Sequence, residues 1–207
     1  MKNKTIKKKF VYLISPNKIK NNRFYKQLED LFKINKISFF QLRLKRESNK
    51  NLLIIGKKIR KICKKYRVKF IVNDDPFLAK NLGSDGCHLG QKDIEVFKAK
   101  KVLNNKLIGV TCHNSLSLVK KAIKNKVSYI AIGAFNSSST KRVKFKADMK
   151  LLKIVKKITN IPLVAIGGIN STNYKNLLLN KANFLAISGY IWRNKKYKPL
   201  EALKKLK

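Results

Sequence analysis

Three polar side chains alternate with leucines in the short stretch QLRLK. Gln41, Arg43 and Lys45 are separated by single leucines, and this alternation predicts that they share one face of an extended strand. An amide and two cations on a buried strand face are costly unless anions or other partners satisfy them. The stretch is therefore a candidate anion-binding element.

Carboxylates are scarce in this sequence, yet they gather in one segment. The chain has 10 Asp and Glu residues, and four of them lie between Asp74 and Asp93. Asp74 and Asp93 follow neighbouring apolar runs, and Asn73 adds an amide oxygen. Two carboxylates and an amide suit Mg²⁺, which keeps several waters and binds substrate phosphates. The alternative interpretation is that these residues cap a helix and close a turn.

Hydroxyl groups and glycines follow other apolar runs and suit phosphate binding. Ser138 and Thr140 provide hydroxyls beside the charge of Lys141, which is expected to reach a phosphate or pyrophosphate. The AIGGIN and ISG stretches offer backbone N–H groups ahead of predicted helices, a common phosphate site. The residues concerned there are Gly168, Ser188 and Gly189.

The elements that must position these groups are eight short apolar runs separated by amphipathic stretches with helical periodicity. Eight strands with intervening helices in 207 residues predict an α/β fold, a single-domain (β/α)₈ TIM barrel. An open doubly wound sheet, which usually has about five or six strands, is the alternative. In a barrel, functional groups cluster where strands end. The runs are FVYLISP, FFQLRLK, FIVND, GCHLG, LIGVTCH, YIAIGAF, PLVAIGG and FLAISG.

The expected domain spans residues 1–207, with a basic lead over 1–9 and a short helix over 195–207. The first apolar stretch is too short for a signal peptide, and no run reaches a membrane span of about 18 residues. A cytoplasmic protein is expected. The three cysteines lack metal-ligand spacing and are expected to be reduced thiols in or near the core.

The formal net charge is +40, which first suggests nucleic-acid binding. The lysines recur on the polar face of every predicted helix, however, and are not gathered in one block. We therefore interpret them as a compositional bias whose field attracts anionic substrates. No specific nucleic acid and no membrane partner are expected, and self-association is left open.

The motifs QLRLK, VNDDPFLAKNLGSDGCHLGQKD, IGVTCHN, STK, VAIGGIN and ISG resemble the thiamine-phosphate synthase family in order and spacing. The resemblance extends from about Tyr12 to Trp192. It implies a barrel enzyme, a transferase of thiamine biosynthesis. The family joins 4-amino-5-hydroxymethyl-2-methylpyrimidine pyrophosphate to a thiazole phosphate and releases pyrophosphate.

The resemblance also implies a role for each residue. Mg²⁺ would be held by Asp74 and Asp93, and the pyrimidine pyrophosphate by Gln41, Arg43, Lys45 and Asn73. Further substrate contacts would come from Thr111, Ser138, Thr140, Lys141, Gly168, Ser188 and Gly189.

The expected chemistry begins with loss of pyrophosphate, whose charge Mg²⁺, Arg43, Lys45 and Lys141 would stabilise. Attack by a neutral thiazole nitrogen needs no general base, so His113 is expected to line the site. Two alternatives remain at this point. A related thiazole tautomerase would use His113 as its acid–base group, and a basic barrel without catalysis would bind nucleic acid.

Overall fold

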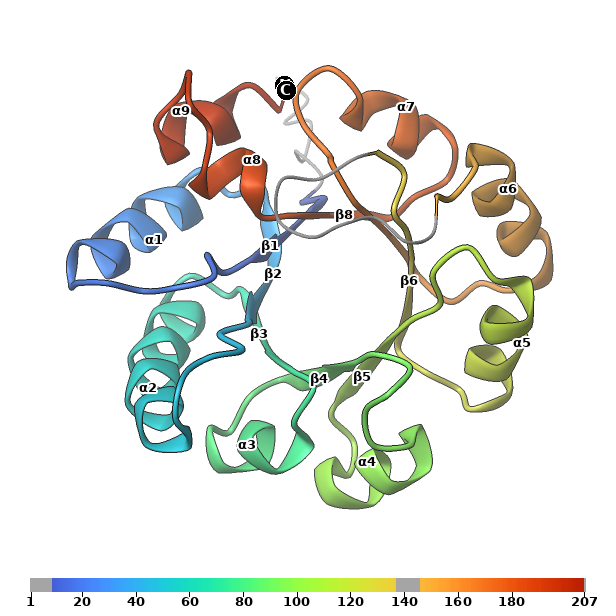
Figure 1. The fold of residues 1–207 in the computed structure, drawn as a ribbon, viewed down its shortest axis with the longest axis horizontal. Helices are drawn as coiled ribbons and strands as arrows, with labels where there is room; N and C mark the ends of the chain where they lie inside the picture. The colour runs from blue at the N-terminus through green and yellow to red at the C-terminus, as the bar shows by residue number, and fades with distance from the viewer. Residues whose placement is uncertain (1–8, 137–145, 207) are drawn as a thin grey trace, which may run out of the picture.

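Eight parallel strands close into a barrel over the residues that the computed structural model describes, 9–136 and 146–206 (Figure 1). Each strand pairs with the next in the chain, and the last pairs with the first through Leu13 and Ile187. This closure confirms the predicted barrel and excludes the open sheet. The strands are β1 Val11–Ile14, β2 Ile37–Leu42, β3 Lys69–Asn73, β4 Gly86–Leu89, β5 Leu107–Thr111, β6 Tyr129–Gly133, β7 Leu163–Ile166 and β8 Phe184–Ile187.

Helices surround the barrel on its outside, as Figure 1 shows. Their apolar faces pack on the strands while their lysines face solvent. In the long second helix, for example, Ile59 and Cys63 are buried and the hydroxyl of Ser48 caps the first turn. The helices are α1 Arg23–Lys33, α2 Asn49–Lys65, α3 Pro76–Asn81, α4 Val96–Leu103, α5 Leu116–Lys124, α6 Met149–Ile158, α7 Tyr174–Leu179, α8 Gly189–Trp192 and α9 Pro199–Lys204.

The hydrophobic core has two parts. The larger part lies between strands and helices and contains aliphatic side chains from nearly every element. The smaller part fills the barrel interior and is rich in aromatic rings, including Tyr12, Tyr129 and the partly buried Phe39 and Phe184. Because side chains fill the interior, the barrel is a packed core and not a pore.

The structure fixes where β2 ends and where α5 and α7 begin. β2 ends at Leu42, so Arg43 and Lys45 lie beyond the strand. The prediction that they share a face of this strand with Gln41 was therefore wrong. Ser115 caps α5, with its hydroxyl accepting from the Leu118 N–H. α7 begins after Asn173, which is its N-cap residue.

All three cysteines are buried free thiols, as expected. Among the described residues, no helix combines the length and apolar character that a membrane crossing requires.

Candidate active site

The predicted site residues that the structure describes lie at or just after the carboxyl ends of six strands. Because all strands of the barrel are parallel and adjacent, these ends form one rim. The rim carries Gln41, Arg43 and Lys45 at β2, Asn73 and Asp74 at β3, Asp93 after β4, Thr111 at β5, Gly168 after β7, and Ser188 and Gly189 after β8.

Asp74 is the meeting point of three charged side chains from neighbouring strands. Its Oδ2 atom lies 2.9 Å from the Nζ atom of Lys45. The Lys45 side chain is 55% exposed and the Asp74 side chain 31% exposed. The carboxyl group of Asp93 lies beside that of Asp74, close enough for the two groups to affect each other's protonation. Three of the predicted site residues, Lys45, Asp74 and Asp93, therefore lie together.

The two carboxyl groups have opposite pKa shifts. Burial raises the pKa of Asp74, but hydrogen bonds from Lys45 and Asp93 and the charge of Arg43 outweigh it, so the net shift is downward. Burial raises the pKa of Asp93, and the nearby Asp74 raises it further against the opposing effect of the Gly90 N–H. The pair thus shares a proton most readily at Asp93.

The backbone at Asp74 is held in a strained conformation. Its φ is +65°, a left-handed value that Asp adopts more readily than most residues. The Asp75 N–H donates to the Asn73 carbonyl at 2.8 Å, closing a three-residue turn around Asp74. The Asp74 N–H donates to the His88 carbonyl at 2.8 Å, which ties this turn to β4. Strain of this kind is typical of functional sites.

The neighbouring carboxylates separate into capping and site roles. Asp75 caps α3, since its Oδ1 accepts from the N–H groups of Phe77 and Leu78 at 2.8 and 2.9 Å. Asp93 also closes a turn, because its Oδ2 accepts from the Gly90 N–H at 2.6 Å. The alternative interpretation therefore holds for the Asp75 cap and for the Asp93 turn, although Asp93 also lies beside Asp74.

The Asp74 and Asp93 pair fits a divalent cation in its chemistry. No group of three or more His, Cys, Asp or Glu side chains in the described residues could hold a metal. Two carboxylates suffice for Mg²⁺, however, because it takes its other ligands from water and substrate phosphates. A cation between two carboxyl groups would replace the proton that they otherwise share.

Ser15, which the sequence did not single out, joins three strand ends. Its buried hydroxyl accepts from the Arg43 N–H at 2.9 Å and donates to the Arg43 carbonyl at 3.2 Å. Its own carbonyl accepts from the Ser188 hydroxyl at 3.1 Å. A single serine after β1 therefore fixes the backbone of Arg43 relative to the loop after β8.

Two predicted site residues bond to buried partners inside the barrel. The Gln41 Nε2 donates to the Tyr12 hydroxyl at 3.2 Å, and the Thr111 hydroxyl lies 2.8 Å from the His88 Nε2. Sequence reasoning missed His88 and turned to His113, which lies past the end of β5 with φ +50°. A histidine inside an apolar strand run was the available signal.

The glycine residues predicted to bind phosphate follow the ends of β7 and β8. Gly167 and Gly168 have φ values of +106° and +57°, which favour glycine. The Gly168 carbonyl accepts from the Asn173 side chain at 2.9 Å. This bond orients the loop between β7 and α7.

The predicted phosphate contacts Ser138, Thr140 and Lys141 lie outside the described residues. The described residues on either side, Phe135 and 146–149, line a cavity of about 400 Å³ at the end of β6.

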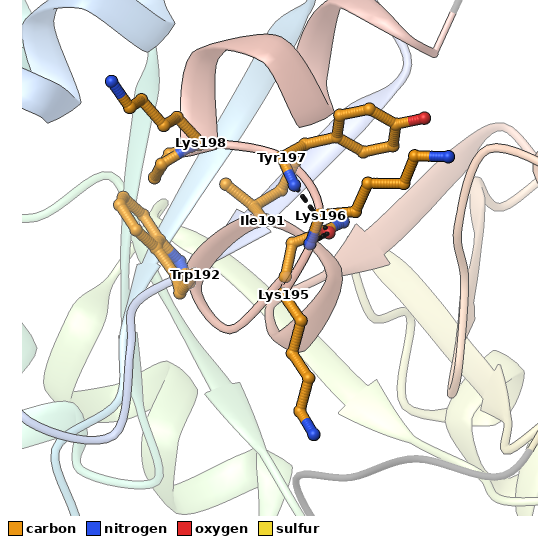
Figure 2. Close-up of a pocket in the computed structure, with 8 residues that line it drawn as sticks. Ile191, Trp192, Lys195, Lys196, Tyr197 and Lys198 are labelled. Carbon is orange, nitrogen blue, oxygen red and sulfur yellow. Dashed lines mark hydrogen bonds between the residues drawn. The ribbon is translucent and has the colours of Figure 1, made fainter.

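A second cavity, of about 310 Å³, lies between α8 and α9. Figure 2 shows that Lys195, Lys196 and Lys198 extend from it in different directions. Their ammonium groups do not converge, so this cavity is not an obvious anion site despite its lysines.

Comparisons with known proteins agree with this geometry. The family model for thiamine monophosphate synthase matches residues 11–191. A thiamine-phosphate synthase from Pelagibacter ubique is 65% identical over 207 residues, covering 100% of both chains. One from Nitrosomonas eutropha is 38% identical over 153 residues, covering 73% of this chain and 72% of its own.

Solved structures show the same fold. A thiamine phosphate pyrophosphorylase from Pyrococcus furiosus has a TM-score of 0.83 at 24% identity, covering 97% of this chain and 94% of its own. One from Bacteroides thetaiotaomicron has a TM-score of 0.69 at 17% identity, covering 95% of both chains. Because the family model matches residues 11–191 and a relative is 65% identical over the full length of the chain, the chain belongs to the thiamine monophosphate synthase family.

Proposed function

We propose that the barrel rim joins 4-amino-5-hydroxymethyl-2-methylpyrimidine pyrophosphate to the thiazole phosphate, forming thiamine phosphate and pyrophosphate. Family membership and the relatives' identities support the transferase activity itself. The structural observation that carries the proposed mechanism is the contact of Lys45, Asp74 and Asp93. A lysine and two carboxyl groups at one rim can bind a pyrophosphate together with a cation.

In this proposal Asp74 and Asp93 hold Mg²⁺. The ion, when bound, supplies positive charge to the oxygen atoms of the departing pyrophosphate. Lys45 has a double role, since it holds Asp74 ionised and lies at the exposed side of the pair, where a pyrophosphate would approach. The low pKa of Asp74 keeps that ligand ready for a cation at neutral pH.

Cationic side chains would stabilise the bond-breaking step. The C–O bond of the pyrimidine pyrophosphate breaks, its electron pair leaves with the pyrophosphate, and a pyrimidine-stabilised carbocation remains. Arg43, Lys45 and Lys141 would bind the charge that grows on the leaving group. Ser15 supports this step indirectly, because it fixes the backbone of Arg43.

The second step needs positioning and no proton transfer. The thiazole nitrogen attacks the carbocation with its lone pair and has no proton to lose. Gln41, Asn73 and Thr111 would hold the pyrimidine pyrophosphate, and alignment of the two substrates contributes much of the rate. The thiazole phosphate and adjoining phosphate contacts would come from Ser138, Thr140, Gly168, Ser188 and Gly189.

A coupling assay tests the proposal. The protein is incubated with both substrates, with Mg²⁺ or with a chelator, and thiamine phosphate and pyrophosphate are measured. Equal amounts of the two products, formed only with Mg²⁺, are expected. Conversion of a thiazole tautomer without any thiamine phosphate would instead support the tautomerase.

Matched variants assign the metal site. Asp93→Asn removes one proposed ligand, whereas Asp75→Asn removes a nearby carboxylate that only caps α3, a role that Asn also fills. We expect the first to raise the Mg²⁺ concentration needed for half-maximal rate at least about 10-fold, a loss of about 1.4 kcal/mol. The second should leave it unchanged, and equal effects of the two variants would refute the assignment.

A cytoplasmic site of action is part of the proposal. Three free thiols without disulfides suit a reducing compartment. Fractionation of cells that produce a tagged protein tests this location, and recovery in the membrane or extracellular fraction would contradict it.

A further inference from the structure

Five side chains form a continuous series of hydrogen bonds across the barrel interior. In order they are Gln41, Tyr12, Tyr129, His88 and Thr111, and we call them the interior network. The successive distances are 3.2 Å, 2.8 Å, 3.1 Å and 2.8 Å, with His88 using Nδ1 toward Tyr129 and Nε2 toward Thr111. The network therefore connects two rim residues on β2 and β5 through buried groups.

The packing around Tyr129 holds the middle of the network in place. The imidazole of His88 stacks on the Tyr129 ring with centroids 5.6 Å apart. Gly109 provides the space, because a Cβ atom there would lie 1.9 Å from the nearest atom of that ring. Neither ring can turn away from its partner without a clash or a lost stacking contact.

Burial restricts how the protons are arranged. Gln41, Tyr12 and Tyr129 are each 2% exposed and His88 is 8% exposed, so a hydroxyl proton without an acceptor is costly. Burial also lowers the pKa of His88 to about 4, so the ring is neutral near pH 7 and one nitrogen accepts.

Only two arrangements then satisfy every link. In the first, each group donates toward Thr111, so His88 carries its proton on Nε2 and Thr111 accepts it. In the second, each group donates toward Gln41, so His88 carries its proton on Nδ1. A mixed arrangement leaves two protons, or two lone pairs, facing each other at one link.

We propose that the interior network couples Gln41 to Thr111, so that the amide orientation at one rim residue sets the hydrogen-bond direction at the other through the His88 tautomer. The Gln41 Nε2 faces Tyr12, which selects the first arrangement. Thr111 then accepts from His88 and keeps its own proton for a partner at the rim. His88 is a positioning residue, because it acts on a ligand only through Thr111.

This arrangement matches the chemistry of one substrate, a step that rests on the proposed function. The Gln41 Nε2 donates to Tyr12 inside the barrel. The amide oxygen of Gln41 can therefore accept a hydrogen bond from an aromatic amine. Thr111 has a proton to donate, which suits a phosphate oxygen. The pyrimidine pyrophosphate carries both groups, so a single arrangement serves its two ends.

The His88 tautomer can be read directly by NMR correlation of the ring nitrogens with the ring C–H protons. The chain has two histidines, and His113→Asn assigns the signals, since Asn tolerates the left-handed backbone at that position. We expect a protonated Nε2 and an unprotonated Nδ1 at His88. A protonated Nδ1 in the unaltered protein would overturn the assigned direction.

The coupling is tested by Gln41→Glu at pH 8. An ionised carboxylate only accepts, so every link should reverse and the His88 proton should move to Nδ1. The control is the same substitution with Tyr129→Phe, which interrupts the network and should remove this response. Because burial raises the pKa of a carboxyl group at this position, its ionisation is checked by its carbon-13 shift. A Gln41→Glu protein that retains the Nε2 proton while that carboxyl group is ionised refutes the coupling, as does a switch that persists in the double variant.

Failure of this inference is separable from failure of the proposed function. The NMR measurement needs no substrate, so the tautomer switch is observable in a protein that forms no thiamine phosphate. Conversely, normal product formation with an unresponsive His88 refutes the coupling alone. Should Gln41→Glu not fold, the tautomer in the unaltered protein still decides the direction.

Discussion

Ser15→Ala tests whether one buried hydroxyl positions Arg43. The hydroxyl is 1% exposed and makes two bonds to the Arg43 backbone, at 2.9 Å from the N–H and 3.2 Å to the carbonyl. An unpaired N–H at a poorly solvated position costs about 1–3 kcal/mol, so we expect the variant to lose about 2 kcal/mol of unfolding free energy. For a domain of this size the loss corresponds to a fall of about 4–8 °C in the unfolding midpoint.

The same substitution should reduce activity beyond its effect on stability. A displacement of Arg43 by a fraction of an ångström weakens its alignment with the pyrophosphate, and we expect kcat/KM to fall about 10- to 100-fold. Urea unfolding and steady-state coupling kinetics, measured well below the unfolding midpoint, separate the two effects.

Ser38→Ala is the matched control for that experiment. Ser38 lies near the start of β2, and its hydroxyl donates to the Lys9 carbonyl at 3.0 Å. We expect a loss of about 1 kcal/mol and unchanged kinetics. If Ser15→Ala keeps normal kcat/KM, or loses no more stability than Ser38→Ala, the positioning argument is refuted.

Three further substitutions separate packing, charge and protonation. Gly109→Ala should lower the free energy of unfolding by at least about 1–3 kcal/mol, because the new methyl carbon would lie 1.9 Å from the Tyr129 ring. An unchanged midpoint in urea would contradict this packing. Lys45→Met should reduce kcat at least about 100-fold, which is the effect of one lost electrostatic contact. It should change the free energy of unfolding by less than about 1 kcal/mol, because the Lys45–Asp74 ion pair is partly exposed. Retained activity would refute the role of Lys45. Burial lowers the pKa of His88 from its ordinary value to about 4, so the unfolded chain binds more protons between about pH 6.5 and 4 and stability falls by about 3 kcal/mol as pH drops through that window. Urea titrations of the unaltered protein and His88→Asn should differ in this pH slope, and equal slopes would assign the acid sensitivity elsewhere.

The barrel was predictable because buried parallel strands appear as continuous apolar runs. The end of β2 was not, since the alternating QLRLK pattern continues past the residue where pairing stops. The last β2 residue in the β2–β3 register is Leu42, opposite Val72. A strand ends where its pairing with neighbouring strands stops, and a single run of sequence does not contain that information.

The contact of Asp74 with Asp93 followed from the parallel arrangement, since neighbouring strands end at one rim. The role of Ser15 and the interior network did not follow, because their partners are distant in sequence. Tyr12 and Tyr129 are 117 residues apart, and each looks like an ordinary aromatic residue in an apolar run. Only the closed barrel brings their hydroxyl groups together.

The pairing of β8 with β1 also governs how the protein is made. During synthesis, β1 emerges from the ribosome long before residues 184–187 can pair with it. Until then the growing sheet has two open edges that could pair with another nascent chain. The charge of +40 makes neighbouring unfinished chains repel one another at low ionic strength. The lysines whose field is expected to attract anionic substrates to the finished barrel would therefore also protect the unfinished one from aggregation.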